Sequence, residues 1–289
     1  MILFEHSEKK MGSQFTLGVV AKTKHEAATL VAQGFKEITR LETLLTEFSE
    51  NSDTARINQN AGKQPVRVSN ETFALLNRCK AIYKLTQGAF DLTTAPLKAI
   101  YNFKAKTFNF PATKTITNTL NLIGFTTLEL NKTTQTAFLK NKNSKLSFAS
   151  VGKGFAADYV KKIWQQMGVK SGYINASGDL TTFGCKPDGT AWKIAIANPE
   201  NPKQTLFSIP VKNASAATSG DYFQYFMHNG IRYAHTLNPL TGYPVHGIKS
   251  TTVLSPNAEL SDALATAVTV KGVEKGMAFI NQLPNTHCI

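Results

Sequence analysis

The sequence predicts an α+β fold with mixed, largely antiparallel sheets flanked by helices, and three features of the pattern indicate it. Apolar residues recur at steps of three and four in the first 90 residues and again after residue 155, which is typical of amphipathic helices. Short alternating runs bounded by Gly, Pro, Asn and Asp dominate residues 171–254. The helices and strands do not alternate regularly, as they do in parallel α/β sheets.

The N-terminal part is predicted to be mainly helical after one strand. Phe15–Ala21 alternates as a strand does, and the apolar residues from Leu30 to Phe48 follow helical spacing over about six turns. A second helix is expected over Glu71–Gln87, with Gly88 as its left-handed C-cap. Lys98–Thr119, rich in Lys, Thr and Asn, is predicted to be an irregular surface connection.

The remainder is predicted to combine one long helix, many short strands and two short final helices. Helices are expected over Phe155–Met167, Leu260–Val270 and Val273–Leu283. Strands are expected at Thr136–Leu139, Lys145–Phe148, Ser171–Ile174, Asp179–Phe183, Trp192–Ala197, Leu206–Val211, Ile231–Leu237 and Ser250–Leu254.

The length and composition indicate a globular protein. A chain of 289 residues can form one large domain or two lobes that share a cleft. We expect a single domain over residues 1–289, and two intertwined lobes within that domain are also compatible with the sequence. No apolar stretch has membrane-spanning length, and the N-terminus lacks the pattern of a secretory signal. We therefore expect a cytoplasmic protein without a transmembrane segment, or a periplasmic or membrane-anchored one if the N-terminus has been trimmed.

The charge and the cysteines narrow the function. The formal net charge of +13 would favour nucleic acid, but the 32 Lys and Arg are scattered and no nucleic-acid-binding motif is present. A basic surface that attracts an anionic small molecule is the better interpretation. Cys79, Cys185 and Cys288 are far apart, which indicates neither a disulfide framework nor a zinc site.

Asp262 and Thr266 are candidate metal ligands. They are four residues apart in a predicted helix, so both side-chain oxygens project from one face. Carboxylate and hydroxyl oxygens are hard ligands, which favour Mg²⁺ or Ca²⁺ over Zn²⁺. The pair also fits a helix in which Asp262 complements the positive N-terminal end and Thr266 is a packing residue.

A phosphate site is predicted where a strand turns into a helix through Gly152-Lys153-Gly154. Backbone N–H groups at a helix start bind anions, and a lysine there is unfavourable unless an anion is present. An ordinary loop with an exposed lysine has the same pattern. His235, at the end of a predicted strand, is a candidate general base if it faces the phosphate, and a structural histidine otherwise.

Further small-residue turns complete a series of motifs in a fixed order. The series is Met11-Gly12-Ser13, Phe48 with Arg56-Ile57-Asn58, Gly88-Ala89-Phe90-Asp91, Val151-Gly152-Lys153-Gly154 with Asp158, Asn175 to Asp179, Thr218-Ser219-Gly220-Asp221-Tyr222, His235 to Pro244, and Asp262 with Thr266. This series, which spans almost the whole chain, resembles the ApbE family of FAD:protein FMN transferases. The resemblance implies a T-fold-like α+β architecture with an FAD cleft between two lobes. It also implies Mg²⁺-dependent transfer of FMN from FAD to a Thr or Ser hydroxyl of a target flavoprotein, with release of AMP.

The resemblance assigns roles to individual positions. It places Met11 and Phe48 at the adenine end of FAD and Ala89, Phe90 and Asp91 in the flavin pocket, with Lys153 and Thr236 as further contacts. It makes Asp262, Thr266 and a backbone carbonyl near Ser150 the ligands of Mg²⁺, and His235 the base.

Three positions depart from the family pattern. Ser147 occupies an FAD-binding position where aspartate is usual, Ala176-Ser177 replaces a glycine pair, and Leu240 replaces a basic residue. These changes bear on FAD affinity and partner recognition but not on the metal ligands. Two alternatives therefore stay open beside the transferase: an FAD pyrophosphatase that yields FMN and AMP, and a flavin-binding protein without turnover.

Overall fold

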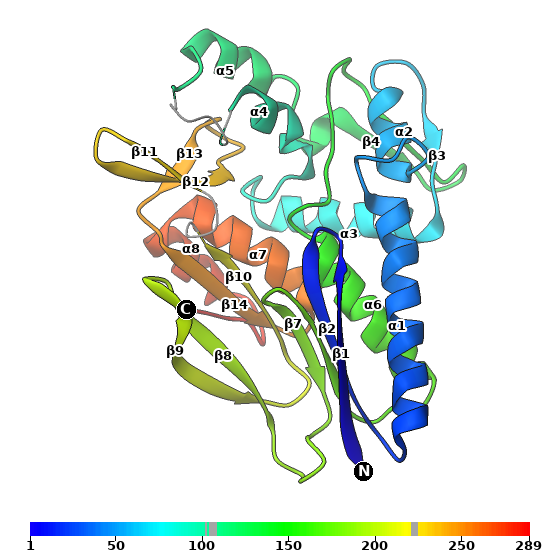
Figure 1. Ribbon diagram of the computed structural model, residues 1–289. Helices are drawn as coiled ribbons and strands as arrows, with labels where there is room; N and C mark the ends of the chain where they lie inside the picture. The colour runs from blue at the N-terminus through cyan, green and yellow to red at the C-terminus, as the bar shows by residue number, and fades with distance from the viewer. Residues whose placement is uncertain (102, 104–108, 221–224) are drawn as a thin grey trace.

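The computed structural model describes residues 1–101, 103, 109–220 and 225–289, and it confirms the mixed α+β class (Figure 1). A seven-stranded sheet with strand order β1-β2-β6-β7-β10-β14-β15 forms its centre, and every pair of neighbours in it is antiparallel. Its strands are β1 (Ile2–Lys10), β2 (Ser13–Ala21), β6 (Gly172–Ala176), β7 (Asp179–Phe183), β10 (Ser215–Gly220), β14 (Ser250–Ser255) and β15 (His287–Cys288).

Three helices cover one face of this sheet: α1 (Lys24–Leu45), α6 (Gly152–Gln166) and α7 (Ala258–Lys271). Helix α1 buries residues at helical spacing, among them Leu30, Phe35 and Ile38, against Leu17 of β2 and its neighbours. The indole of Trp164 in α6 is buried and donates to the carbonyl of Leu30 at 3.0 Å, which joins α6 to α1. This helical layer fixes the position of the start of α6.

The opposite face is covered by the hairpin of β8 (Trp192–Asn198) and β9 (Asn201–Val211). Val20 of β2 packs with Trp192 and Ile194, whereas its neighbour Val19 belongs to the helical side. Because successive side chains of a strand point to opposite faces, the sheet has an apolar core on each side.

The other elements form two small three-stranded sheets and a further set of helices. One sheet contains β11 (Tyr225–His228), β12 (Ile231–Leu237) and β13 (Pro244–His246), and α7 packs against it through β12. In Figure 1 this sheet and α4 and α5 lie above α7. The second sheet has β3 (Val66–Arg67), β5 (Thr136–Leu139) and β4 (Leu128–Asn131). The remaining helices are α2 (Asp53–Gln59), α3 (Asn70–Leu85), η1 (Leu92–Thr94), α4 (Ala95–Ile100), α5 (Thr113–Leu120), η2 (Phe125–Thr127) and α8 (Val273–Ile280).

Three expectations from the sequence are wrong. Helix α1 stops at Leu45, so Phe48 lies beyond it and is 91% exposed. The helix ends there because the hydroxyls of Thr54 and Ser52 donate to the carbonyls of Leu45 and Thr46, which takes up two terminal acceptors.

The segment Lys145–Phe148 is not a strand. The side-chain amide of Asn58 both donates to the carbonyl of Leu146 and accepts its N–H, so a side chain takes the place of a neighbouring strand. The region Lys98–Thr119 is not wholly irregular, because α5 begins at Thr113 and buries Ile116; residues 102 and 104–108 lie outside the described part. Tertiary packing outweighs the weak helix preference of a Thr-rich segment.

No helix within the described ranges is both long enough and apolar enough to cross a membrane. The organisation as one domain over residues 1–289 stays a prediction.

Candidate active site

The first turn of α6 holds a lysine against a buried carboxylate. Lys153 Nζ donates to Asp179 Oδ2, and Asp179, at the first position of β7, is 3% exposed. Burial raises the pKa of Asp179, and the ammonium of Lys153 opposes that shift. Burial alone would lower the pKa of Lys153, but the charges of Asp262 and Asp179 raise it overall, so this lysine stays charged.

Asp262 in α7 is the second carboxylate of this group. Gly154 N–H donates to it, but Oδ2 is buried and has no hydrogen-bond partner among the described residues. Burial and the charge of Asp179 raise the pKa of Asp262 to about 7, although Lys153 acts in the opposite direction. A buried carboxylate oxygen without a donor is costly unless a cation binds it, so this atom suits a metal ion.

The other predicted ligands fit the same interpretation. Thr266 lies one turn after Asp262 on α7 and is half-buried, and Ser150 lies in the turn that leads into α6. Within the described ranges, no three His, Cys, Asp or Glu side chains are grouped so that they could hold a metal. The donors predicted for a metal are the carboxylate of Asp262, the hydroxyl of Thr266 and a carbonyl near Ser150. Such a sparse set of oxygens suits Mg²⁺, which commonly takes its remaining ligands from water and substrate phosphates.

A close contact between two helix starts brings these groups together. A Cβ on Gly154 would lie 2.4 Å from the carbonyl oxygen of Ala258, so only glycine permits this approach of α6 to α7. The carboxylate of Asp158 accepts the N–H groups of Ala258 and Glu259 at 3.0 and 2.8 Å. Arg78 binds Glu259 through two hydrogen bonds of 2.7 and 2.8 Å, which fixes the first turn of α7 from α3 as well.

His235 and Thr236 lie in a bulge of β12. Tyr233 pairs with His246 and Leu237 pairs with Pro244, so four steps along β12 oppose two steps along β13. Bulges change the direction in which a side chain points and are common beside active sites. Because α7 packs against β12, the bulge lies on the element next to Asp262 and Thr266.

Two positions predicted to bind FAD, Met11 and Ser147, lie near the start of α6. Met11 has a positive φ of 50° in the β1–β2 turn, and a Cβ on Gly152 would lie 3.4 Å from its Cε. Ser147 donates its N–H to the carbonyl of Leu92 and its hydroxyl to Glu47 Oε1 at 3.5 Å. Glu47 precedes the exposed Phe48, so Ser147 connects the segment after α1 to the residues that follow Asp91.

The segment of Ala89, Phe90 and Asp91 lies inside the protein. Phe90 is fully buried in the core, and Asp91 caps η1 by accepting the N–H and hydroxyl of Thr93 at 2.8 and 2.7 Å. Burial raises the pKa of Asp91 to about 6. The segment therefore has a clear structural role, and its contact with flavin stays a prediction. Leu240 reaches it from the loop after β12, since its Cδ2 would be 3.1 Å from a Cβ on Gly88.

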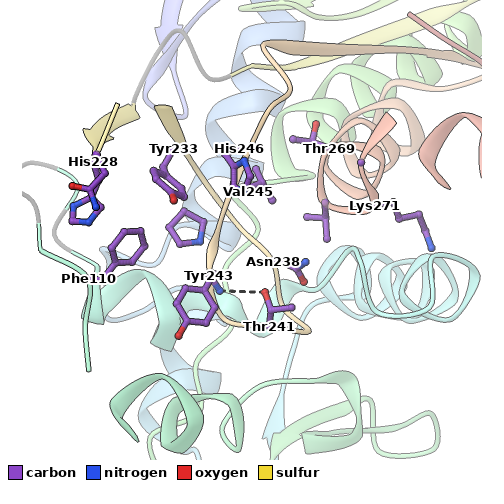
Figure 2. A pocket seen from close by; sticks show the side chains of 14 residues that line it. Phe110, His228, Tyr233, Asn238, Thr241, Tyr243, Val245, His246, Thr269 and Lys271 are labelled. Atoms are coloured by element: carbon purple, nitrogen blue, oxygen red, sulfur yellow. Dashed lines mark hydrogen bonds between the residues drawn. The ribbon is translucent and has the colours of Figure 1, made fainter. Parts of the chain in front are cut away.

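The structure thus brings Lys153, Asp262 and their unpredicted neighbour Asp179 into one charged group. Asp179 was recognisable only as part of a small-residue turn, because its pairing with Lys153 depends on the tertiary fold. A cavity of about 610 Å³ lies beside β13, and none of the predicted site residues lines it (Figure 2). We place the active site at the charged group, because buried ionic chemistry rather than cavity size characterises a phosphoryl-transfer site. Asp221 and Tyr222 lie outside the described residues.

Comparison with known proteins agrees with this geometry. The sequence pattern of the ApbE family matches residues 11–289. An FAD:protein FMN transferase of Klebsiella pneumoniae (strain 342) is 32% identical over 282 residues, covering 97% of this chain and 86% of the relative. One of Vibrio cholerae serotype O1 is 29% identical, covering 93% and 84%.

Solved structures show the same architecture. The ApbE protein of Thermotoga maritima superposes with a TM-score of 0.89 at 26% identity. The match covers 99% of this chain and 93% of the Thermotoga maritima chain. The apo flavinyl transferase ApbE of Pseudomonas stutzeri gives a TM-score of 0.85 at 28% identity, covering 96% and 87%. The whole-length match in sequence and in fold has one conclusion: this chain is a member of the ApbE family.

Proposed function

We propose that the protein is a Mg²⁺-dependent FAD:protein FMN transferase. It would transfer FMN from FAD to a Thr or Ser hydroxyl of a target flavoprotein and release AMP. The names of its relatives support the reaction, and the observation that carries it is the buried group of Lys153, Asp179 and Asp262, with one carboxylate oxygen lacking a donor.

Lys153 and the start of α6 would bind the pyrophosphate. An ammonium and the positive end of a helix dipole both attract phosphate oxygens. Asp179 is a positioning residue in this proposal, because its ion pair holds Lys153 in place. Asp262, Thr266 and the carbonyl of Ser150 would hold Mg²⁺, which when bound would neutralise charge on the pyrophosphate.

His235 would act as the general base. The acceptor oxygen forms a bond to the phosphorus of the FMN half while the bond from that phosphorus to the bridging oxygen breaks, and AMP leaves with that oxygen. The hydroxyl proton passes to the imidazole of His235. Water in place of the hydroxyl would give FMN and AMP.

The remaining positions would hold the two ends of FAD. Met11 and Phe48 would border the adenine, while Ala89, Phe90 and Asp91 would support the flavin side and Ser147 and Thr236 would contact the dinucleotide. The exposure of Phe48 and the contact of Met11 with the start of α6 agree with this arrangement.

Flavin transfer can be tested directly. The protein is incubated with FAD, Mg²⁺ and a cell extract, and a fluorescent flavin-labelled protein band and an equal amount of AMP are measured. His235→Asn should retain FAD binding but lose transfer by roughly a hundredfold or more, as expected when a general base is removed. AMP and FMN without a labelled band would indicate a hydrolase instead. Absence of FAD binding in the presence of Mg²⁺ would contradict the proposal.

A further inference from the structure

Arg78 of α3 holds the starts of two other helices. Its guanidinium donates from Nε and Nη2 to the two carboxylate oxygens of Glu259, in the first turn of α7, at 2.7 and 2.8 Å. The same guanidinium lies 5.4 Å from the centre of the Phe155 ring, in the first turn of α6. Lys153 lies in that turn of α6, and Asp262 lies one turn further along α7. Arg78 therefore bridges the two helices that carry the charged group.

The first turn of α7 depends on side chains for its position. The first N–H groups of a helix have no acceptor within the helix. Asp158 of α6 accepts two of them, at 3.0 and 2.8 Å, and Asn257 accepts that of Leu260 at 3.0 Å. Asp262 follows Glu259 at a distance of about 4.5 Å along the helix axis. A shift of the first turn would therefore move the carboxylate of Asp262 as well.

The bridge from Arg78 differs from an ordinary surface ion pair, because its acidic partner is buried. The side chain of Glu259 is 10% exposed and that of Arg78 is 46% exposed. A buried carboxylate that loses its cation is strongly destabilising. Burial is the main cause of the raised pKa values of Asp158 and Asp262, and the charge of Glu259 adds to both. Arg78 thus compensates a carboxylate in a region where other buried carboxylates already lie close together.

We propose that Arg78 is a positioning residue of the metal site, because its bridge to Glu259 fixes the first turn of α7 and so holds the carboxylate of Asp262 in place for Mg²⁺. The inference rests on the proposed function, since it concerns the metal site named there. Arg78 acts through Glu259 in this proposal and contacts neither the metal nor FAD.

Positioning and simple charge predict opposite results for the same variants. Arg78→Gln removes a positive charge, which by charge alone would strengthen the binding of a cation nearby. Glu259→Gln would by charge alone weaken it, and the two changes together would cancel. If the bridge positions Asp262, each substitution should instead lower the affinity for Mg²⁺ by roughly tenfold, as the loss of outer partners of metal ligands does. The double variant should then lose no more than either single variant.

Two measurements check these expectations. Calorimetry with Mg²⁺ at saturating FAD gives the metal affinity of each variant. Amide hydrogen exchange of the metal-free protein reports on the first turn of α7 directly, and Arg78→Gln should speed exchange in residues 257–266 but not in the distant hairpin of β8 and β9. The Mg²⁺ concentration for half-maximal transfer should rise, with little change in kcat at saturating Mg²⁺.

Arg78→Lys retains the charge but not the fork of donors. An ammonium cannot form the two parallel bonds of a guanidinium, so this variant should recover only part of the Mg²⁺ affinity.

Arg40→Gln is the matched control. Arg40 lies 5.4 Å from the ring centre of Tyr159, one turn further along α6, and bonds to Glu71 of α3 at 2.8 Å. It removes the same charge from a stacked arginine that joins α6 to α3 rather than to α7, so the Mg²⁺ affinity should be unchanged. Melting temperatures confirm that each variant is folded.

The outcomes separate positioning from charge and from the proposed function. Tighter Mg²⁺ binding by Arg78→Gln, unaltered affinity in the double variant or full recovery in Arg78→Lys would indicate a charge effect and overturn the positioning role. An equal loss in Arg40→Gln would also overturn it. Absence of Mg²⁺ binding by the unaltered protein with FAD would instead remove the metal site of the proposed function.

Discussion

The burial of Asp262 lowers the stability of the fold when its carboxylate is ionised. Its carboxylate is buried, close to the charge of Asp179, and its pKa is raised to about 7 by burial first and by that charge second. Above this pH the ionised side chain lowers the stability of the metal-free fold, because the unfolded chain would ionise it more easily. A cation bound at Asp262 would offset this loss of stability.

Asp262→Asn should therefore separate stability from metal binding. In EDTA at pH 8 the variant should melt at a higher temperature than the unaltered protein. Removing a residue that only hydrogen-bonds to a metal ligand typically lowers metal affinity by roughly 10- to 100-fold. Replacing the ligand itself should lower the Mg²⁺ affinity by at least as much. Calorimetry and melting curves measure both effects. Glu274→Gln, a charge removal at an exposed position of α8, is the control and should change neither.

Asp91 and Asp188 show how burial decides the ionisation of a carboxylate. Each accepts the N–H and the hydroxyl of a threonine two residues later, at 2.8 and 2.7 Å for Asp91 and 2.9 and 2.7 Å for Asp188. The pKa of the exposed Asp188 is lowered by these bonds, whereas burial outweighs the same bonds at Asp91 and raises its pKa to about 6.

The raised pKa of Asp91 predicts that the stability of the fold depends on pH. Between about pH 4 and 6 the folded protein retains a proton on Asp91 that the unfolded chain has lost, so stability falls as the pH rises through this window. Asp91→Asn should remove that contribution, which is at most about 1.4 kcal/mol per pH unit. Urea unfolding at several pH values measures the slope. Asp188→Asn, the matched control, should leave the slope in this window in place; equal slopes in all three proteins would contradict the argument.

At the scale of elements, the contact between α6 and α7 depends on one missing side chain. Gly154→Ala places a Cβ 2.4 Å from a backbone oxygen of Ala258, so the helices must separate. We expect a loss of about 1–3 kcal/mol of stability, the usual cost of overpacking, together with weaker Mg²⁺ binding at Asp262.

Gly152→Ala is the matched control for this prediction. It lies in the same turn of α6, but its Cβ would meet only the flexible end of Met11 at 3.4 Å and Phe148 Cβ at 3.6 Å. Chemical unfolding should show little change for Gly152→Ala. A similar loss in both variants would mean that the first turn of α6, rather than its contact with α7, determines stability.

The elements also show what a sequence can and cannot predict. Strands β5, β7 and β12 have the predicted bounds, because their alternation and turn residues are local signals. The end of α1 and the segment around Leu146 were mispredicted, since they depend on side-chain hydrogen bonds from Ser52, Thr54 and Asn58, which periodicity does not reveal. The same limit applies to the site.

For the site, residue types could be predicted but not their partners. The spacing of Asp262 and Thr266 indicated a shared helix face, and α7 contains both residues. The pairing of Lys153 with Asp179, and the clamp of Asp158 on α7, join residues 26 and 100 positions apart. Only the folded sheet determines such distances.

At the scale of the whole molecule, Mg²⁺ and FAD should bind cooperatively. Among the described residues no group of three His, Cys, Asp or Glu side chains could hold a metal, so the phosphates of FAD would complete its coordination. FAD should increase the affinity for Mg²⁺, and by thermodynamic linkage Mg²⁺ should increase the affinity for FAD by the same factor. Titration calorimetry with each ligand in the presence and absence of the other measures both factors. Independent binding of the two would contradict a shared site.

The clamp of Asp158 on the start of α7 also has a consequence for folding. It joins α6 to α7 across 100 residues, and closing a flexible loop of that length costs about 4 kcal/mol of chain entropy. Helices such as α1 can form from local contacts early, but the charged group requires most of the central sheet to be in place. The buried carboxylates then meet only in the completed fold, so a partly folded chain offers FAD no organised pyrophosphate site.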